Sequence, residues 1–504
     1  MLQCKKVDSE DNVMFPISKS DSAQCHWSVT HFLEKWGKQP SNKILDLNNC
    51  ALTARDVAEL TSMVCLLPEL EEVNLSWNDL IGGTLEPLTL QFKYLQELKV
   101  LQLSSCRLTG KDIAFLGDAL EAISQLEILD LSWNTTIGGS LSLLTPKIPK
   151  SCPLKTLKLT DCNLTPEDGA ALAESLNKFR NLEILDLSIN KNIGCSLKNI
   201  AQELKYVSGL KVLNLNTCGM KQDGLQWLDR ALQHLLELKM LDVSCNKGIG
   251  GGFQNTEAHL ASLNNLEVLD LHQCCITEED MAVLSQIIPL LSSLQELNLS
   301  SNKNVGVSAD HLLSRLQFLP NLNSVLLSNC SLQHDSFASF AEAALHLPEL
   351  KTLDLSWNKC VGGNLKLLLK ALNLGGEIRV LRLSSCGLVD EDLSSLAEGI
   401  HAGYLPQLQS LDLSYNSCIS GQGWVKLGQA LLALEQLSEL DVSLRPSSRG
   451  DCGDWISQLL STLQTLPMFT ELSLQGWVLP RAKQKELGRF KQDNKRNILF
   501  DIRY

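Results

Sequence analysis

The sequence predicts an α/β solenoid with a parallel sheet on its concave side and helices on its convex side. Three observations predict this fold class. The chain repeats every 28 residues, each repeat contains a Leu-x-Leu strand pattern, and asparagine and cysteine alternate five residues after the first leucine. The six residues Leu-Asp-Leu-Ser-Trp-Asn at 129–134 recur unchanged at 353–358 and nearly unchanged at 73–78.

The first leucine-type position of the repeat marks the period along nearly the whole chain. It falls at Leu45, Val73, Leu101, Leu129, Leu157, Leu185, Leu213, Leu241, Leu269, Leu297, Val325, Leu353, Leu381, Leu411, Leu440 and Leu472. The spacing is 28 residues in twelve consecutive steps and then 30, 29 and 32. A fixed period of this length indicates a solenoid of about 16 repeats, in which each coil covers the apolar face of its neighbour.

The Leu-x-Leu pattern predicts a short strand with both leucines facing inward, and stacked strands give a parallel sheet. Asparagine then follows in every second repeat, at Asn78, Asn134, Asn190, Asn246, Asn302, Asn358 and Asn416. Its amide both donates and accepts, so we expect it to bond backbone groups of the turn after the strand. The intervening repeats have a small buried cysteine instead, at Cys50, Cys106, Cys162, Cys218, Cys274, Cys330 and Cys386.

The other half of each repeat has helical signatures. After the cysteine strands, Thr-x-x-Asp capping boxes predict helix starts at Thr53, Thr109, Thr165 and Thr277. After the asparagine strands, an isoleucine or valine stands three residues on and glycine usually follows, as in Ile137-Gly138-Gly139. These glycines predict a tight turn into the convex helix. They do not indicate a phosphate-binding loop, because no Lys-Ser or Lys-Thr follows them.

The alternating asparagine and cysteine repeats, together with their length, resemble the ribonuclease-inhibitor type of leucine-rich repeat over roughly residues 44–479. The resemblance implies a horseshoe with strands on the concave side and a full helix on the convex side of each repeat. The asparagine repeats depart from that pattern in one respect. Their apolar residue lies three places after the asparagine, as in Asn134 to Ile137, where the inhibitor-like pattern has it two places on.

Four segments follow from the period. Residues 1–24 are polar and without periodicity, so we expect disorder there. Residues 25–40 are predicted to form an N-terminal cap helix, residues 41–480 the leucine-rich repeat solenoid, and residues 481–504 a basic C-terminal cap or tail. The basic residues of this last segment form either a solvent-exposed face or a binding site.

Composition limits the partners and the compartment. The net charge is −13, and residues 481–504 alone carry +5, so the preceding body carries −18. An acidic body argues against nucleic acid as a ligand and favours a basic protein partner. The chain has no apolar stretch long enough for a membrane span and no secretory signal at its start. Its 17 cysteines include no Cys-x-x-Cys pair, which argues against a metal site and fits the reducing cytoplasm.

Motifs of catalysis are absent from the sequence. It contains no Gly-x-Ser-x-Gly, no His-Glu-x-x-His and no Walker loop. We therefore expect a non-enzymatic protein without a catalytic site, a cofactor, a bound metal or a small-molecule substrate.

The outward strand positions of the concave face carry eight aspartates, among them Asp130, Asp186, Asp354 and Asp412. They predict an acidic stripe that a basic partner could contact. The same Leu-Asp-Leu-Ser motif is common in intracellular leucine-rich repeats. The alternative interpretation is therefore that the stripe is ordinary repeat surface without a binding role. Adjacent repeats both carry aspartate only at Asp242 with Asp270 and at Asp412 with Asp441, which keeps the repulsion between neighbouring strands small.

Aromatic residues stand at the end of four strands, at Trp77, Trp133, Trp357 and Tyr415. The core does not need a ring there, and exposed aromatic side chains are frequent anchors of protein recognition. The alternative is that each ring lies flat on the turn of its neighbour. Ile189 and Cys245 occupy the same position in the middle of the arc, so the rings would form two separate clusters.

The sequence thus favours an interaction scaffold that binds protein partners through an acidic, aromatic concave surface. Two alternatives follow from the fold resemblance alone. One is an inhibitor of a basic enzyme such as a ribonuclease, and the other is an activator of a small GTPase.

Overall fold

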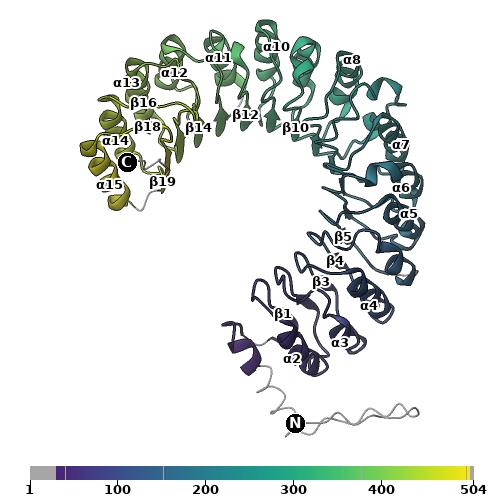
Figure 1. The fold of residues 1–504 in the computed structure, drawn as a ribbon. Helices are drawn as coiled ribbons and strands as arrows, with labels where there is room; N and C mark the ends of the chain where they lie inside the picture. Colours follow the sequence, from purple (N-terminus) through teal and green to yellow (C-terminus); the bar gives the residue numbers. More distant parts are fainter. Residues whose placement is uncertain (1–29, 40, 151, 376, 495–496, 500–504) are drawn as a thin grey trace, which may run out of the picture.

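The computed structural model describes residues 30–39, 41–150, 152–375, 377–494 and 497–499. The chain forms an open horseshoe with the strands along its inner side and the helices along its outer side (Figure 1). The predicted α/β solenoid is confirmed. The segment predicted to be disordered, residues 1–24, lies outside the described residues, as do the first five residues of the predicted cap.

Seventeen three-residue strands form one parallel sheet, and each strand pairs in register with the next one along the chain. Leu45, for example, lies beside Val73, which lies beside Leu101. The strands are β1 (Ile44–Asp46), β2 (Glu72–Asn74), β3 (Val100–Gln102), β4 (Ile128–Asp130), β5 (Thr156–Lys158), β6 (Ile184–Asp186), β7 (Val212–Asn214), β8 (Met240–Asp242), β9 (Val268–Asp270), β10 (Glu296–Asn298), β11 (Ser324–Leu326), β12 (Thr352–Asp354), β13 (Val380–Arg382), β14 (Ser410–Asp412), β15 (Glu439–Asp441), β17 (Glu471–Ser473) and β19 (Asn497–Leu499).

The helices follow the strands on the outer side of the horseshoe, and residues 30–34 are helical before β1. They are α2 (Ala54–Val64), α3 (Glu86–Thr89), α4 (Gly110–Leu120), α5 (Pro166–Ser175), α6 (Leu197–Glu203), α7 (Gln222–Leu232), α8 (Glu278–Ile287), α9 (Ala309–Arg315), α10 (His334–Ala344), α11 (Leu365–Gly375), α12 (Asp390–His401), α13 (Gly421–Ala430), α14 (Trp455–Thr465) and α15 (Arg481–Asn494).

The expectation of a full helix in every repeat is wrong for three asparagine coils. The coil of β2 has only the four-residue α3. The described residues after β4 form the 3-10 helices η2 (Leu141–Leu143) and η3 (Thr145–Lys147), and those after β8 form η7 (Phe253–Asn255) and η8 (His259–Ser262). Pro146 and Pro149 lack the N–H that an α-helix needs, and the run of glycines at 250–252 disfavours helix.

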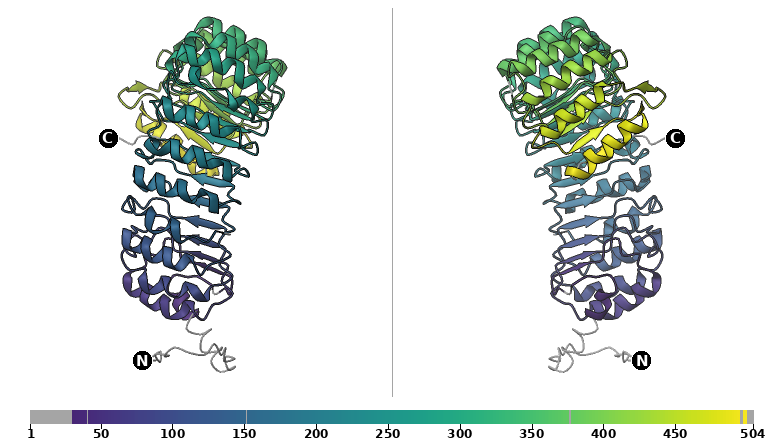
Figure 2. Two further views of the ribbon diagram at one scale, coloured as in Figure 1. Left: turned by 90° about the vertical axis from the view of Figure 1, so that its right-hand side faces the viewer. Right: turned by 90° about the vertical axis from the view of Figure 1, so that its left-hand side faces the viewer.

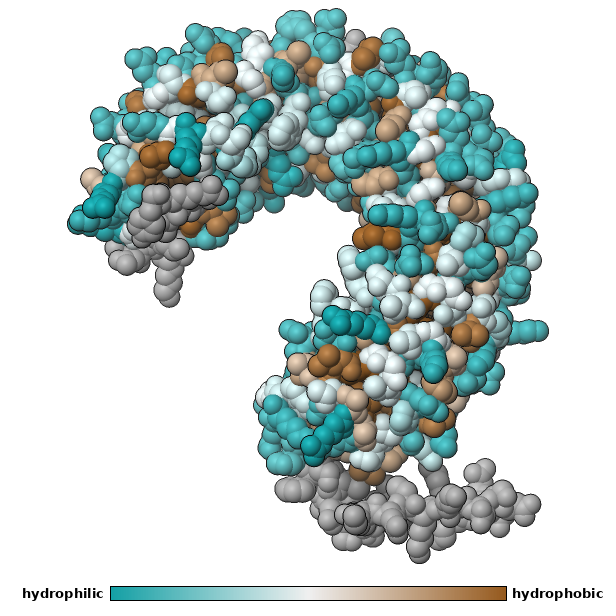
Figure 3. Space-filling view, in the orientation of Figure 1, coloured by the Kyte–Doolittle hydropathy of each residue, from teal (hydrophilic) through white to brown (hydrophobic). Residues whose placement is uncertain are grey.

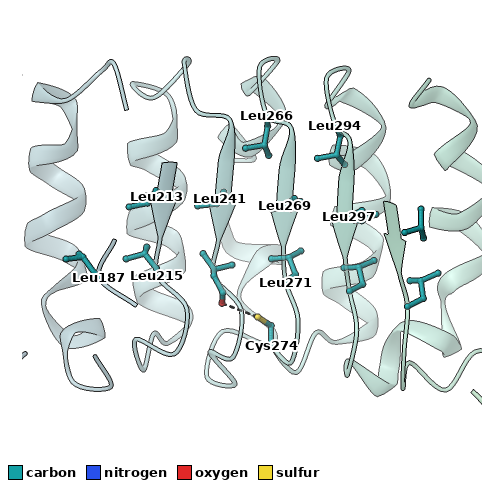
Figure 4. Packing of buried hydrophobic residues seen from close by; sticks show 14 of the residues in the cluster. Leu187, Leu213, Leu215, Leu241, Leu266, Leu269, Leu271, Cys274, Leu294 and Leu297 are labelled. Carbon is teal, nitrogen blue, oxygen red and sulfur yellow. Dashed lines mark hydrogen bonds between the residues drawn. The ribbon is translucent and has the colours of Figure 1, made fainter. Parts of the chain in front are cut away.

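The core lies between the sheet and the helices. Figure 4 shows leucines of neighbouring coils stacked in rows, such as Leu213, Leu241 and Leu269. Each of these side chains is buried against its counterparts one coil away, so every coil depends on its neighbours for a complete core.

The buried asparagines tie adjacent coils together. The Asn134 amide donates to the carbonyls of Leu103 and Leu131, at 2.9 and 2.7 Å. Its oxygen accepts hydrogen bonds from the N–H groups of Cys106 and Leu108, both at 3.0 Å. These backbone groups belong to buried residues of two adjacent coils, so the asparagine supplies hydrogen-bond partners to the turns of both coils at once.

The cysteines occupy the same slot in the other coils. The Cys274 thiol lies 3.3 Å from the Val243 carbonyl of the preceding coil (Figure 4). Burial raises the pKa of the Cys106 and Cys162 thiols to about 12, so these side chains are neutral hydrogen-bond donors. Cys50, in the coil of β1, is only half-buried.

The capping boxes connect coils as well as starting helices. The Asp168 carboxylate accepts a bond from its own cap residue, the Thr165 N–H, at 2.8 Å. It also accepts bonds from Gly139 and Leu141 of the preceding coil, at 2.6 and 2.8 Å. Gly139 has a φ of +82°, which glycine adopts without strain. The same bridge from a capping aspartate to a positive-φ glycine of the preceding coil recurs at Asp112, Asp280 and Asp392.

An ion-pair ladder runs along the edge where the first nine strands begin. Glu71 lies between Lys43 and Lys99, with N–O distances of 2.5 and 2.7 Å. The hydrogen bonds from these two lysines lower the pKa of Glu71 to about 2. The ladder continues through the pairs Lys155–Glu127, Lys211–Glu183 and Lys239–Glu267.

The last coils depart from the regular path. A second, two-stranded sheet of β16 (Gly450–Asp451) and β18 (Trp477–Val478) projects from one edge of the solenoid (Figure 2). The rings of Trp424 from α13, Trp455 from α14 and Trp477 from β18 pack together. In the described part of the chain, no helix is long and apolar enough to cross a membrane.

Candidate functional site

The aromatic residues occupy one backbone position of the repeat, three residues after the strand ends. The Trp133 N–H donates to the Thr160 carbonyl of the next coil at 2.6 Å, and Trp357 makes the equivalent bond to Ser384 at 2.7 Å. These bonds place the rings at the edge of the sheet where the strands end.

The backbone at this position is left-handed in every coil from β1 to β14, with φ between 49° and 63°. The residues are Asn49, Trp77, Ser105, Trp133, Asp161, Ile189, Thr217, Cys245, Gln273, Ser301, Asn329, Trp357, Ser385 and Tyr415. Asparagine, aspartate and glycine accept this conformation most readily, whereas a bulky side chain is disfavoured there. The backbone therefore gives no reason for an indole at this position.

Burial gives no such reason either. Trp77, Trp133 and Trp357 are 57, 46 and 49% exposed, so about half of each residue's surface remains in solvent. Tyr415 is half-buried. The three indoles neither fill the core nor suit the backbone, and the structure leaves them accessible at one edge of the concave sheet.

The rings divide between the two arms of the horseshoe. Trp77 and Trp133 follow β2 and β4 on the N-terminal arm, and Trp357 and Tyr415 follow β12 and β14 on the C-terminal arm (Figure 1). Ile189, Cys245 and Ser301 hold the same position on the asparagine coils between them. We call these two groups the N-terminal and C-terminal aromatic clusters.

The C-terminal cluster is assembled by side-chain contacts. The Trp357 and Tyr415 rings lie edge to face, with centroids 6.1 Å apart. The Arg445 guanidinium lies over the Trp357 ring, 5.6 Å from its centroid, and donates to the Ser385 hydroxyl at 2.7 Å. Arg445 was not among the residues predicted for the site, because it lies in the irregular turn after β15 and not at a fixed position of the repeat.

Each predicted aspartate has a structural role in addition to its charge. One oxygen of Asp130, Asp186, Asp354 or Asp412 accepts a hydrogen bond, at 2.9 Å in each case, from the N–H two residues further on. This bond stabilises the turn after the strand. The second oxygen of Asp354 lies 4.0 Å from Arg382, so part of the acidic stripe is neutralised within the sheet.

The aspartates that fall in adjacent coils are perturbed. Asp412 lies beside Asp441 in the sheet register, and burial together with the charges of Asp441 and Asp354 raises the pKa of Asp412. Asp242 lies beside Asp270, and burial with the neighbouring Asp270 and Asp186 charges raises the pKa of Asp242. In both pairs that the sequence identified, the neighbouring carboxylate thus adds to the effect of burial on the pKa of Asp412 or Asp242.

The described residues also form a pocket away from the predicted positions. A cavity of about 840 Å³ lies between α13, α14 and β18, where it is lined by Trp455 and Trp477 and not by the predicted residues. Within the described ranges, no group of histidine, cysteine and acidic side chains could hold a metal ion. Hydrophobic residues on the face shown in Figure 3 form separate patches among polar ones.

The alternating asparagine and cysteine coils, each built on a Leu-x-Leu strand, define the class of leucine-rich repeat proteins. A family model described as "Leucine Rich repeat" matches residues 150–173. Among solved structures, an internalin from Listeria monocytogenes has 18% sequence identity and a TM-score of 0.46, and the alignment covers 83% of this chain and 94% of that one.

Two curated relatives are similar over most of their length. The ribonuclease inhibitor of Mus musculus is 30% identical over 411 residues, which is 79% of this chain and 89% of that protein. The ribonuclease inhibitor of Sus scrofa is 30% identical over 409 residues, covering 78% of this chain and 88% of the relative. The chain therefore belongs to the ribonuclease inhibitor family of leucine-rich repeat proteins.

Proposed function

We propose that this protein is a non-enzymatic, cytoplasmic scaffold that binds one or more protein partners through the concave sheet and the edge where its strands end. The contact residues are the aromatic clusters, Trp77 and Trp133 with Trp357 and Tyr415, and the aspartates of the stripe, Asp130, Asp186, Asp354 and Asp412. Solenoids of this kind use their extended concave surface for binding. The acidic body favours a partner with a basic surface.

One observation carries the proposal. Three exposed tryptophans occupy a left-handed backbone position at which the fold prefers small or asparagine-like residues. Their cost to the fold is offset if they anchor a partner, because a rigid indole buries a large area at little cost in side-chain entropy. Strained residues at an exposed edge are a recurrent mark of binding sites.

The test compares the partners that co-purify with matched variants. Trp133→Asn and Trp357→Asn together remove one indole from each cluster and keep a residue suited to the backbone. Thr217→Asn and Gln273→Asn place asparagine at the same backbone position in the middle of the arc without removing a ring. We expect the tryptophan pair to lose specific partners by about tenfold or more, measured by quantitative mass spectrometry after affinity purification. Unchanged partners in a folded tryptophan variant would refute the proposal.

A second candidate is inhibition of a ribonuclease, and the similarity to two ribonuclease inhibitors supports it. Inhibitor and scaffold could use the same concave surface, so the two functions differ in the partner and not in the site. A ribonuclease assay with micromolar purified protein decides between them, since an inhibitor must suppress turnover in a concentration-dependent way. No observation on the described residues favours activation of a small GTPase, and we do not propose it.

A further inference from the structure

We infer that Arg445, together with Trp357 and Tyr415, forms a subsite for a single carboxylate of the bound protein partner. This inference rests on the proposed function, because it assumes that the C-terminal aromatic cluster contacts a protein. The inference names the chemical group of the partner that the cluster binds, a carboxylate. It also gives the cluster a positively charged residue, Arg445, whose charge is opposite to that of the acidic stripe.

The irregular turn after β15 fixes the backbone of Arg445. The preceding Leu444 is buried, and its N–H donates to the Gln475 carbonyl at 2.8 Å. Pro446 follows, and the Arg445 carbonyl accepts a hydrogen bond from Ser448 at 2.8 Å. Proline at the second position of such a turn restricts the chain. Arg445 thus leaves the sheet from a defined point, five residues before β16.

The side chain then runs back across the preceding coils. Its guanidinium reaches Ser385, which follows β13, and the ring of Trp357, which follows β12. The Ser385 hydroxyl and the indole face hold the guanidinium from two sides. Ordering a free arginine side chain costs rotamer entropy, and these contacts meet part of that cost before a ligand binds.

The guanidinium keeps most of its donors for a ligand. Arginine has five N–H donors, and among the described residues Arg445 makes one hydrogen bond, to Ser385. The residue is exposed. A planar fork of free donors beside an aromatic ring matches a carboxylate, which accepts two parallel hydrogen bonds.

The surroundings limit the ligand to one carboxylate on an apolar body. Trp357 and Tyr415 offer ring surface on which an aliphatic group can lie. Asp354, Asp412 and Asp441 lie at the ends of β12, β14 and β15, so an extended polyanion would meet their negative charges. A glutamate or aspartate side chain, or a chain terminus, presents the single charge that fits.

The test uses the full chain labelled with 5-fluorotryptophan, in which the resonance of Trp357 is assigned among nine tryptophans by Trp357→Phe. The probes are N-acetyl-leucyl-glutamic acid amide and its glutamine counterpart. We expect the acid to shift the Trp357 resonance with a roughly millimolar dissociation constant and the amide to bind at least about tenfold more weakly. Arg445→Gln should abolish this preference for the acid, and Arg445→Lys should weaken it several-fold, because lysine lacks the planar fork.

The matched control is Arg449→Gln, which removes the same charge from an exposed residue of the same turn and should leave the preference intact. Equal shifts by acid and amide, or an acid preference that survives Arg445→Gln, would overturn the carboxylate subsite. A stronger response to inorganic phosphate than to the acid would also overturn it in favour of a phosphate subsite. If tryptophan variants lose their partners while acid and amide bind equally, only this inference fails. If those variants keep their partners, the proposed function fails.

Discussion

The two arms of the horseshoe place tryptophan at the same backbone position and give it different surroundings. On the N-terminal arm, Trp77 and Trp133 are separated by the coil that carries Ser105, and the described residues show no ring or cation contact to either indole. On the C-terminal arm, Trp357 packs against Tyr415 and lies under Arg445.

At the edge where the strands begin, the N-terminal arm has more side-chain contacts than the C-terminal arm, which is the reverse of the difference between the aromatic clusters. The N-terminal arm has the lysine–glutamate ladder from Lys43 to Glu267. At the equivalent position, the C-terminal arm has uncharged residues in several coils, such as Gln295, Asn323 and Gln409. The repeat thus fixes where a side chain lies, whereas non-periodic neighbours decide what it contacts. Three predictions test how far this difference extends.

The largest effect should be shared by both arms. Asn134→Ala and Asn358→Ala each remove a buried amide that hydrogen-bonds five backbone groups. We expect each to lower the free energy of unfolding by about 4 kcal/mol, because the buried groups lose their partners. Urea denaturation followed by circular dichroism measures this loss, with the exposed Asn181→Ala as a control that should change little. Unequal losses would mean that the arms differ in their cores as well as on their surfaces.

A smaller effect should separate the arms. Trp133→Asn relieves left-handed strain and removes no ring contact, so we expect stability to stay the same or to rise by up to about 1 kcal/mol. Trp357→Asn relieves the same strain but loses the contacts with Tyr415 and Arg445, so we expect a net loss of about 1 kcal/mol. The two thermal unfolding curves, recorded side by side, provide the comparison. Identical shifts would show that the C-terminal cluster adds nothing to stability.

The smallest effect is a pH dependence of the ion-pair ladder, which lies on the N-terminal arm. The pKa of Glu71 falls from 4.5 to about 2 between its two lysines. Its contribution to stability is therefore complete above pH 4.5 and is lost as the pH falls towards 2. Glu71→Gln should lower the unfolding midpoint slightly at pH 6 and much less at pH 2, where about half of the folded molecules have a protonated Glu71. Gln295→Ala, at the equivalent place on the C-terminal arm, should show no such pH dependence.

The periodic features could be predicted from the sequence because each recurs with its neighbours in a known relation. The role of Asn134 follows from its spacing after two leucines, and the cap at Thr165 follows from Asp168 three residues on. The bond from Asp168 to Gly139 of the preceding coil could not be predicted, because it depends on how far one coil is shifted against the next. The loss of the helix after β4 could have been inferred from Pro146 and Pro149, which the period alone conceals.

The candidate site was predictable only in its periodic part. The tryptophans stand at a fixed distance from the strand, so their place at the strand ends followed from counting residues. Their left-handed backbone did not follow, because Trp, Ser, Asp and Ile at one position give no common conformational preference. Arg445 reaches Ser385 across 60 residues of sequence, and only the folded arrangement of the last coils shows that contact.

The bridges between coils set the steps in which a chain of this kind can change its length. An asparagine coil bonds the preceding cysteine coil through its amide, as at Asn134, and its glycine turn is held by the capping aspartate of the following cysteine coil, as at Asp168. Deleting one coil would place two coils of the same kind side by side and leave one set of these groups unmatched. Deleting or duplicating two adjacent coils together, which is 56 residues, keeps both kinds of contact between asparagine and cysteine coils. Such a horseshoe can therefore grow or shrink during evolution, or in the hands of an engineer, by whole pairs.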